Sequence, residues 1–299
     1  MYKKIVYKIR NEVSLNTRQL PFLCTQKEMN YRLARKKHVE NLPVISDYEQ
    51  NLIDTLRTEG VAMTSLNALS IPSTELMLQA VNSLIPKIPQ RVSQNKNEYV
   101  VHATPQQNLD HKEIFLWGLE QRLINIVENY IGLPVAYHGA YFRRDLVNPV
   151  QVKSRLWHVD PEDRKVLKVI IYLNNVDESN GSFEYIPQAF TSQIVSSLKY
   201  RYGYVQDKIM EKVVAPSDFK SCKGVAGTVI FASTGSIFHR GKMPISSDRY
   251  TVFFDYTSRK PIVHNHYGAS FLSDEQLRVL AKNLTPQQKE CVFWKDNFW

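Results

Sequence analysis

The feature that most constrains the fold is a nearly unbroken run of β-branched and apolar residues from Val166 to Leu173. Such a run predicts a buried strand. Turn-forming residues follow at 174–181, and a second strand is expected from Ser182 to Ile186. Further strand patterns at 227–232 and 249–257 complete the set. The order strand, turn, strand, long excursion, strand, loop, strand is typical of a double-stranded β-helix, a cupin-like jelly roll whose interior can hold a metal.

Helical patterns precede these strands. Ser46 to Glu49 forms a capping box at the start of a helix that is expected to end at Gly60. Ser73 is expected to cap a second helix, with Leu76 among the residues of its apolar face. The spacing of apolar residues predicts the longest of these helices over 111–131.

Two further helices are expected near the end of the chain, where Ser273 and Thr285 can act as N-caps. No composition change marks a linker, so we predict an α+β fold in a single domain over 1–299. Its parts are helical support at 1–135, a jelly-roll core at about 136–258 and C-terminal helices at 259–299.

His158, Asp160 and His239 are candidate metal ligands. Residues two apart in an extended strand point the same way, so His158 and Asp160 are expected to face together. Two imidazoles and one carboxylate can occupy one face of a metal octahedron and leave the other positions open, as in non-haem Fe(II) oxygenases. The competing pair, His264 and His266, follows the last strand and has no carboxylate beside it.

Arg249 begins the last predicted strand, and Thr251 shares its face. An arginine within such a strand is rarely buried without an anion. A guanidinium can hold a carboxylate through two parallel hydrogen bonds, and a neighbouring hydroxyl can add a third. The pair is therefore a candidate seat for the distal carboxylate of 2-oxoglutarate; a salt bridge to an internal Asp or Glu is the alternative.

At this point the chain resembles the phytanoyl-CoA dioxygenase family of Fe(II)- and 2-oxoglutarate-dependent oxygenases. The resemblance covers about residues 137–257 and departs at Pro187-Gln188-Ala189-Phe190, where family members often read Pro-Gly-Ser-His. The matching segments are Trp157–Asp163, Tyr172–Leu173, Val176–Asp177, Asn180–Gly181, Gly227, His239–Gly241 and Arg249–Tyr250.

The resemblance implies that His158, Asp160 and His239 bind Fe(II) and that Arg249 binds 2-oxoglutarate. 2-Oxoglutarate and O2 would take the open iron positions, and a C–H bond of a small molecule would be oxidised by hydroxylation, desaturation or cyclisation. Related halogenases place Gly or Ala at the carboxylate position to admit chloride, so Asp160 argues against halogenation.

Four other residues are candidate site residues. Tyr141 and Arg143 share one face of a predicted strand shortly before the metal motif, where Tyr141 can meet 2-oxoglutarate and Arg143 the substrate. Lys168 and Tyr172 share a face of the next strand and can also contact the substrate. Ordinary sheet packing is the alternative for all four.

The net charge of +9 raises the question of an anionic partner. Many of the basic residues fall at 32–38, which fits a solvated helix face. Related nucleic-acid demethylases carry a second arginine six residues after the first, where this chain has Asp255. No nucleic-acid-binding motif is present, so nucleic acid is not expected as a partner.

Three widely spaced cysteines, no signal-peptide core and no apolar run of membrane-spanning length together predict a cytoplasmic protein without a membrane contact. A small-molecule substrate is expected, selected by the segments 87–112 and 188–226. Two other classes use the same three ligands. One is a metal-dependent hydrolase, which leaves Arg249 and Thr251 without a role, and the other is a cupin-like binding protein.

Overall fold

A computed structural model describes residues 21–89, 98–263 and 272–295. It combines helices with two antiparallel sheets, which confirms the mixed α+β class. The strands are β1 (Val61–Ser65), β2 (Val100–His102), β3 (Val135–Asp145), β4 (Leu167–Tyr172), β5 (Phe183–Tyr185), β6 (Lys220–Cys222), β7 (Thr228–Ala232), β8 (His239–Gly241) and β9 (Arg249–Ser258). The helices are α2 (Pro21–His38), α3 (Asp47–Glu59), α4 (Leu66–Leu69), α5 (Thr74–Leu84), α6 (Pro105–Asp110), α7 (Lys112–Trp117), α8 (Gln121–Ile131), α9 (Thr191–Leu198), α10 (Asp207–Met210), α11 (Asp274–Leu280) and α12 (Pro286–Val292).

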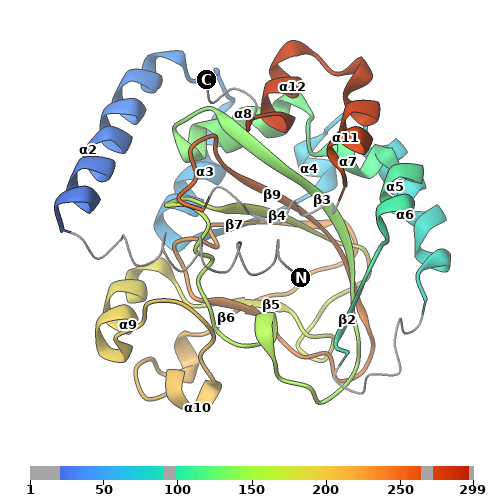
Figure 1. Cartoon of the computed structure of the whole chain (residues 1–299). Helices are drawn as coiled ribbons and strands as arrows, with labels where there is room; N and C mark the ends of the chain where they lie inside the picture. Colours follow the sequence, from blue (N-terminus) through green and yellow to red (C-terminus); the bar gives the residue numbers. More distant parts are fainter. Residues whose placement is uncertain (1–20, 90–97, 264–271, 296–299) are drawn as a thin grey trace, which may run out of the picture.

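The larger sheet has six strands in the order β1-β7-β4-β9-β3-β2, and the smaller has three in the order β6-β5-β8. Figure 1 shows the larger sheet across the middle of the molecule, with α8 and α12 above it and β5 and β6 below it. The larger sheet therefore lies between a helical layer and a second sheet.

Side-chain alternation along β4 divides the apolar residues between two cores. Leu167, Val169 and Ile171 pack into the core shared with the helices. Ile170 and Tyr172 point the opposite way, into the core that also contains Phe183 of the smaller sheet. Since both faces of β4 are covered, its sequence is a continuous apolar run rather than an alternating one.

Long-range contacts override the local helical pattern at 111–131. Instead of one helix, the chain forms α7 and α8, separated at Gly118. The hydroxyl of Tyr137 donates to the carbonyl of Phe115 at 2.9 Å, and that of Tyr256 donates to the carbonyl of Gly118 at 2.7 Å. These tyrosines occupy carbonyls that a continuous helix would use, and a Cβ on Gly118 would collide with Tyr137 and Phe254. The longest described helix is α2.

Of the two helix N-caps expected at Ser46 and Ser73, only the first is present. The capping box of Ser46 and Glu49 is present, and α3 ends at Gly60 in the left-handed conformation. Ser73, in contrast, makes no side-chain capping hydrogen bond, and Leu76 is 56% exposed rather than part of the buried face.

The region expected to be helical support also contributes two strands to the larger sheet. β1 pairs with β7 at one edge, and β2 pairs with β3 at the other. The segment 87–112, expected to help select the substrate, contains β2 and α6, while its residues 90–97 lie outside the described ranges. The histidines at 264 and 266 also lie outside them.

The expected C-terminal helices are present, with Ser273 and Thr285 as N-caps of α11 and α12. Cys222 and Cys291 are buried free thiols. Within the described ranges, no helix has the length and apolar character needed to cross a bilayer.

The packing of the larger sheet against the helices predicts where stability is concentrated. Phe254 is fully buried against Trp117, with ring centroids 4.9 Å apart. We expect Phe254→Ala to lower the free energy of unfolding by about 3–5 kcal/mol, because it leaves a cavity in this core. Leu76→Ala, at an exposed site, should change it by less than about 0.5 kcal/mol. Urea denaturation measures both, and equal losses would contradict the packing described here.

Candidate metal centre

The three predicted ligands converge. One nitrogen of His158, one of His239 and one oxygen of Asp160 all lie within 4.8 Å of one another. His158 donates its backbone N–H to the carbonyl of His239 at 3.1 Å, and His239 donates to that of His158 at 3.0 Å. The backbone N–H of Asp160 donates to Thr234 at 2.9 Å. Backbone pairing therefore joins ligands that are about eighty positions apart in the sequence.

Both imidazoles present the same nitrogen to the centre. Nδ1 of His158 lies 2.8 Å from the carbonyl of Leu156, and Nδ1 of His239 lies 3.3 Å from that of Ile237. A carbonyl can only accept, so each Nδ1 carries the hydrogen and each Nε2 keeps its lone pair. This backbone orientation of the ring is common among metal-bound histidines.

Burial fixes the charge of the ligands. Burial lowers the pKa of both imidazoles, that of His239 to about 3, so they are neutral at neutral pH. Burial alone would raise the pKa of Asp160, but the Lys168 ammonium beside it outweighs burial and holds that pKa well below its usual range. Two neutral nitrogen donors and an ionised carboxylate suit a divalent transition metal.

Lys168 supplies the positive charge beside Asp160. Its Nζ lies 2.8 Å from Oδ2 of Asp160 and 4.0 Å from Oδ2 of Asp255. Burial would lower the pKa of Lys168, but these two carboxylates raise it well above its usual value. The ammonium therefore balances the charge of a carboxylate that is a candidate metal ligand.

A cavity extends from the metal-ligand residues into the space between the sheets. It is lined by every other predicted site residue: Tyr141, Arg143, Lys168, Tyr172, Arg249 and Thr251. His158 and His239 also line it, together with residues that were not predicted: Ser154, Ile170, Phe183, Gly241 and Phe253. Strand alternation could have identified Ile170 and Phe253, which share faces with predicted residues.

Arg249 makes the internal salt bridge that was the alternative to an anion seat. Its Nη2 lies 2.9 Å from Oδ2 of Asp145, on the neighbouring strand. However, Nε and Nη1 of Arg249 are buried and have no hydrogen-bond partner among the described residues. The salt bridge and an anion seat are therefore compatible, since Asp145 uses one nitrogen only.

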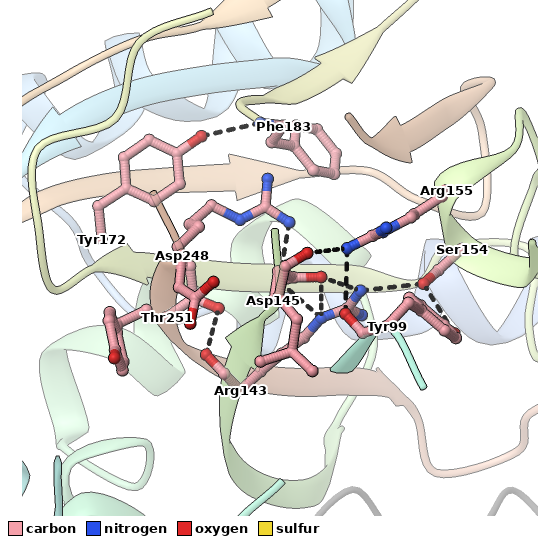
Figure 2. Close-up of polar contacts among 12 residues, drawn as sticks. Tyr99, Arg143, Asp145, Ser154, Arg155, Tyr172, Phe183, Asp248 and Thr251 are labelled. Atoms are coloured by element: carbon pink, nitrogen blue, oxygen red, sulfur yellow. Dashed lines mark hydrogen bonds and ion pairs between the residues drawn. The ribbon is translucent and has the colours of Figure 1, made fainter. Parts of the chain in front are cut away.

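Arg143 shares the same carboxylate. Its Nε lies 3.0 and 2.9 Å from the two oxygens of Asp145, and its Nη2 lies 2.6 Å from Oδ1. Figure 2 shows Arg143, Asp145 and Ser154 joined in one network, with the Arg143 side chain between the other two. Asp145 was missed by the sequence analysis, although its spacing of two from Arg143 placed both on one strand face.

The other predicted residues play different parts. The hydroxyl of Tyr172 donates to the carbonyl of Cys222 at 2.8 Å and accepts from the N–H of Phe183 at 2.9 Å, as Figure 2 shows in part. The ring of Tyr141 stacks on Phe253 at 5.0 Å. The hydroxyl of Thr251 donates a long hydrogen bond, 3.4 Å, to the backbone of Arg143. Tyr172 therefore joins the sheets, while Tyr141 forms part of the cavity wall.

The segment 188–226 lies beside the metal-ligand residues. Trp157 and Val205 exchange backbone hydrogen bonds of 3.0 and 2.8 Å. Next to this pair, the ring of Tyr204 lies 5.2 Å from that of His158, measured between centroids. This segment, which contains α9, α10 and β6, is thus fixed next to a candidate metal ligand.

Comparisons with known proteins place the fold. No family model and no curated protein sequence matches the chain, so the resemblance to the phytanoyl-CoA dioxygenase family stays a prediction. Among solved structures, the chain is similar to the non-heme α-ketoglutarate-dependent carbocyclase SnoK from nogalamycin biosynthesis. The TM-score is 0.50 and the identity 14%, over 75% of this chain and 87% of SnoK. At this identity, the likeness shows a shared fold.

Two further solved structures are similar at lower scores. EctD from S. alaskensis, with 2-oxoglutarate and 5-hydroxyectoine, matches with a TM-score of 0.49 and 14% identity, over 72% of this chain and 76% of EctD. HygX from Streptomyces hygroscopicus, with nickel, 2-oxoglutarate and hygromycin B bound, matches with a TM-score of 0.47 and 12% identity, over 70% of this chain and 87% of HygX.

The Lys168–Asp160 ion pair predicts an effect on metal affinity. Lys168→Met removes a positive charge that competes with a cation for Asp160, so we expect divalent-metal binding to tighten by about tenfold or more. Titration of the metal-free protein with Ni(II) measures the dissociation constant. Lys165→Met controls for the loss of a half-buried lysine, because Nζ of Lys165 lies 2.5 Å from the carbonyl of Tyr130 and not beside a candidate metal ligand. Weaker or unchanged binding in Lys168→Met would show that the ammonium does not compete with metal.

Proposed function

We propose that this protein is an Fe(II)- and 2-oxoglutarate-dependent dioxygenase, similar to the phytanoyl-CoA dioxygenase family, that oxidises a C–H bond of a small molecule. The observation that carries the proposal is that a single cavity contains both the His158 and His239 imidazoles and the buried guanidinium of Arg249. The fold shared with a non-heme α-ketoglutarate-dependent carbocyclase supports it. In this proposal, the two sheets are the two halves of a double-stranded β-helix within one domain.

The spacing along β8 supports a ligand of the length of 2-oxoglutarate. His239 and Gly241 lie on the same face of this strand, two residues and therefore about 7 Å apart. A Cβ built on Gly241 would lie 2.7 Å from Nη2 of Arg249, so the guanidinium packs directly over this glycine. A five-carbon dicarboxylate can bridge two such points, with one end at the metal ligands and the other at the arginine.

The distribution of charge along the cavity supports a divalent metal at one end and 2-oxoglutarate between that metal and the other end. At the end with His158 and His239, two carboxylates, those of Asp160 and Asp255, lie beside the Lys168 ammonium. At the other end, the guanidiniums of Arg143 and Arg249 share Asp145, which leaves an excess of one positive charge. A divalent cation is attracted to the first end and the distal carboxylate of a dianion to the second.

The residues then take distinct roles. His158, Asp160 and His239 would hold Fe(II), which together with 2-oxoglutarate and O2 would supply the oxidising chemistry. Arg249 and Thr251 would hold the distal carboxylate, and Tyr141, stacked on Phe253, would form the wall beside it.

Substrate contacts are proposed for the remaining cavity residues. Arg143 and Lys168 offer charged groups, whereas Tyr172 offers its ring, because its hydroxyl already bonds to two backbone groups. Tyr204, beside His158, is positioned to contact a substrate that approaches the metal.

Turnover of 2-oxoglutarate tests the proposal. With Fe(II) under air, we expect the wild-type protein to form succinate. His158→Ala, Asp160→Ala and His239→Ala should abolish this activity through loss of iron. Arg249→Ala should instead retain iron but weaken 2-oxoglutarate binding by about 30- to 1,000-fold, because a buried charged contact worth about 2–4 kcal/mol is lost.

Arg144→Ala is the matched control for Arg249→Ala. Arg144 is also held by a carboxylate, Asp248, at 2.7 Å, but it does not line the cavity. Its replacement should leave the 2-oxoglutarate requirement unchanged. Absence of succinate from wild-type protein that retains iron would contradict the proposed function, and loss of iron in Arg249→Ala would contradict the role given to Arg249.

A further inference from the structure

Asp145 is the central group of the network at the arginine end of the cavity. The side chain is 1% exposed, and both of its oxygens accept hydrogen bonds from guanidinium groups. Asp145 ends β3, and the register places it directly opposite Arg249, the first residue of β9. The two side chains are therefore a cross-strand pair, the closest arrangement that neighbouring strands allow.

The contacts of Arg249 hold its guanidinium from two sides. On one side, Nη2 donates to Oδ2 of Asp145 at 2.9 Å. On the other, the same nitrogen lies against Gly241, where a Cβ would come within 2.7 Å. With Nη2 held in this way, Nε and Nη1 keep hydrogens that no described residue accepts.

Arg143 holds Asp145 in turn. The fork of Arg143 engages both carboxylate oxygens, and Arg143 is itself bonded to Ser154 at 3.1 Å. Figure 2 shows this chain of contacts from Ser154 through Arg143 to Asp145. Because a two-point contact fixes the carboxylate plane, Oδ2 has a defined direction in which to accept from Arg249.

We propose that Asp145 is a positioning residue for the cosubstrate: it fixes Arg249 in the orientation that receives the distal carboxylate. This inference rests on the proposed function, since it assumes that 2-oxoglutarate is the ligand of Arg249. Asp145 acts through Arg249, and its own charge repels the dianion. Removal of the Asp145 charge should therefore weaken 2-oxoglutarate binding if Asp145 acts by orienting Arg249, and should strengthen it if Asp145 acts only through repulsion.

Asp145→Asn separates the two effects. It keeps the shape of the side chain and removes the negative charge that orients both arginines. If orientation dominates, 2-oxoglutarate binding should weaken by about tenfold or more. If Asp145 served only as a counter-charge, the same change would tighten dianion binding, because the arginine end would become more positive. The measurement is the dissociation constant of 2-oxoglutarate, by calorimetry, with Ni(II) in place of iron.

Two variants control for general damage to the fold. Asp248→Asn removes the carboxylate partner of Arg144. This pair comes from the same two regions of the chain as Asp145 and Arg249, but neither of its residues lines the cavity. It should leave 2-oxoglutarate binding within twofold of the wild type. Gly241→Ala displaces the guanidinium of Arg249 without any change of charge, so it should weaken 2-oxoglutarate binding as Asp145→Asn does. This variant tests the proposal if Asp145→Asn fails to fold.

A double-mutant cycle tests whether Asp145 acts through Arg249. In an Arg249→Ala background, Asp145→Asn should not weaken 2-oxoglutarate binding any further, whereas an independent structural effect would add to the loss. With a wild type that binds 2-oxoglutarate, unchanged or tighter binding in a folded Asp145→Asn variant would overturn this inference alone, and so would unchanged or tighter binding in Gly241→Ala if Asp145→Asn fails to fold. A wild type that does not bind 2-oxoglutarate would overturn the proposed function as well.

Discussion

The reciprocal backbone hydrogen bonds between His158 and His239 are the interaction on which the rest of the site depends. They bring the segment before β4 against the first residue of β8, and β8 pairs with β5 in the smaller sheet. The candidate metal ligands His158 and His239 are therefore held together at β8 of the smaller sheet. Because backbone groups make this contact, Nε2 of each imidazole remains available for a ligand.

The cost of burying ionised groups is offset locally along the cavity. At one end Lys168 faces two carboxylates, and at the other Asp145 faces two guanidiniums. Carboxylates therefore outnumber the ammonium at one end, and guanidiniums outnumber the carboxylate at the other, where two nitrogens of Arg249 have no hydrogen-bond partner among the described residues. A buried polar group without a partner is costly, so in the proposed function a cation enters at the first end and an anion at the second. This polarity is the physical basis of the proposed pairing of iron with 2-oxoglutarate.

Local patterns in the sequence predicted the core strands and many, though not all, of the residues that line the cavity, because alternation fixes which side chains share a face. They failed where the local structure depends on contacts between residues that are far apart in the sequence. The helix expected over 111–131 breaks at Gly118 because tyrosines from other strands occupy its carbonyls. Asp145 was missed because its importance comes from Arg249, which lies opposite it only after β3 and β9 have paired. The neighbouring sequence contains Gly118 and the two-residue spacing between Arg143 and Asp145, but it does not reveal the distant contacts that give these residues their roles.

The most direct test of the central claim is the visible spectrum of the protein with Fe(II) and saturating 2-oxoglutarate in the absence of oxygen. A keto acid chelated to Fe(II) gives a weak charge-transfer band, so the account predicts that this band appears when 2-oxoglutarate is added to the iron-loaded protein. A protein that retains iron but never develops the band, at any concentration of 2-oxoglutarate, would contradict the proposal that the His158, Asp160 and His239 centre and Arg249 serve one ligand.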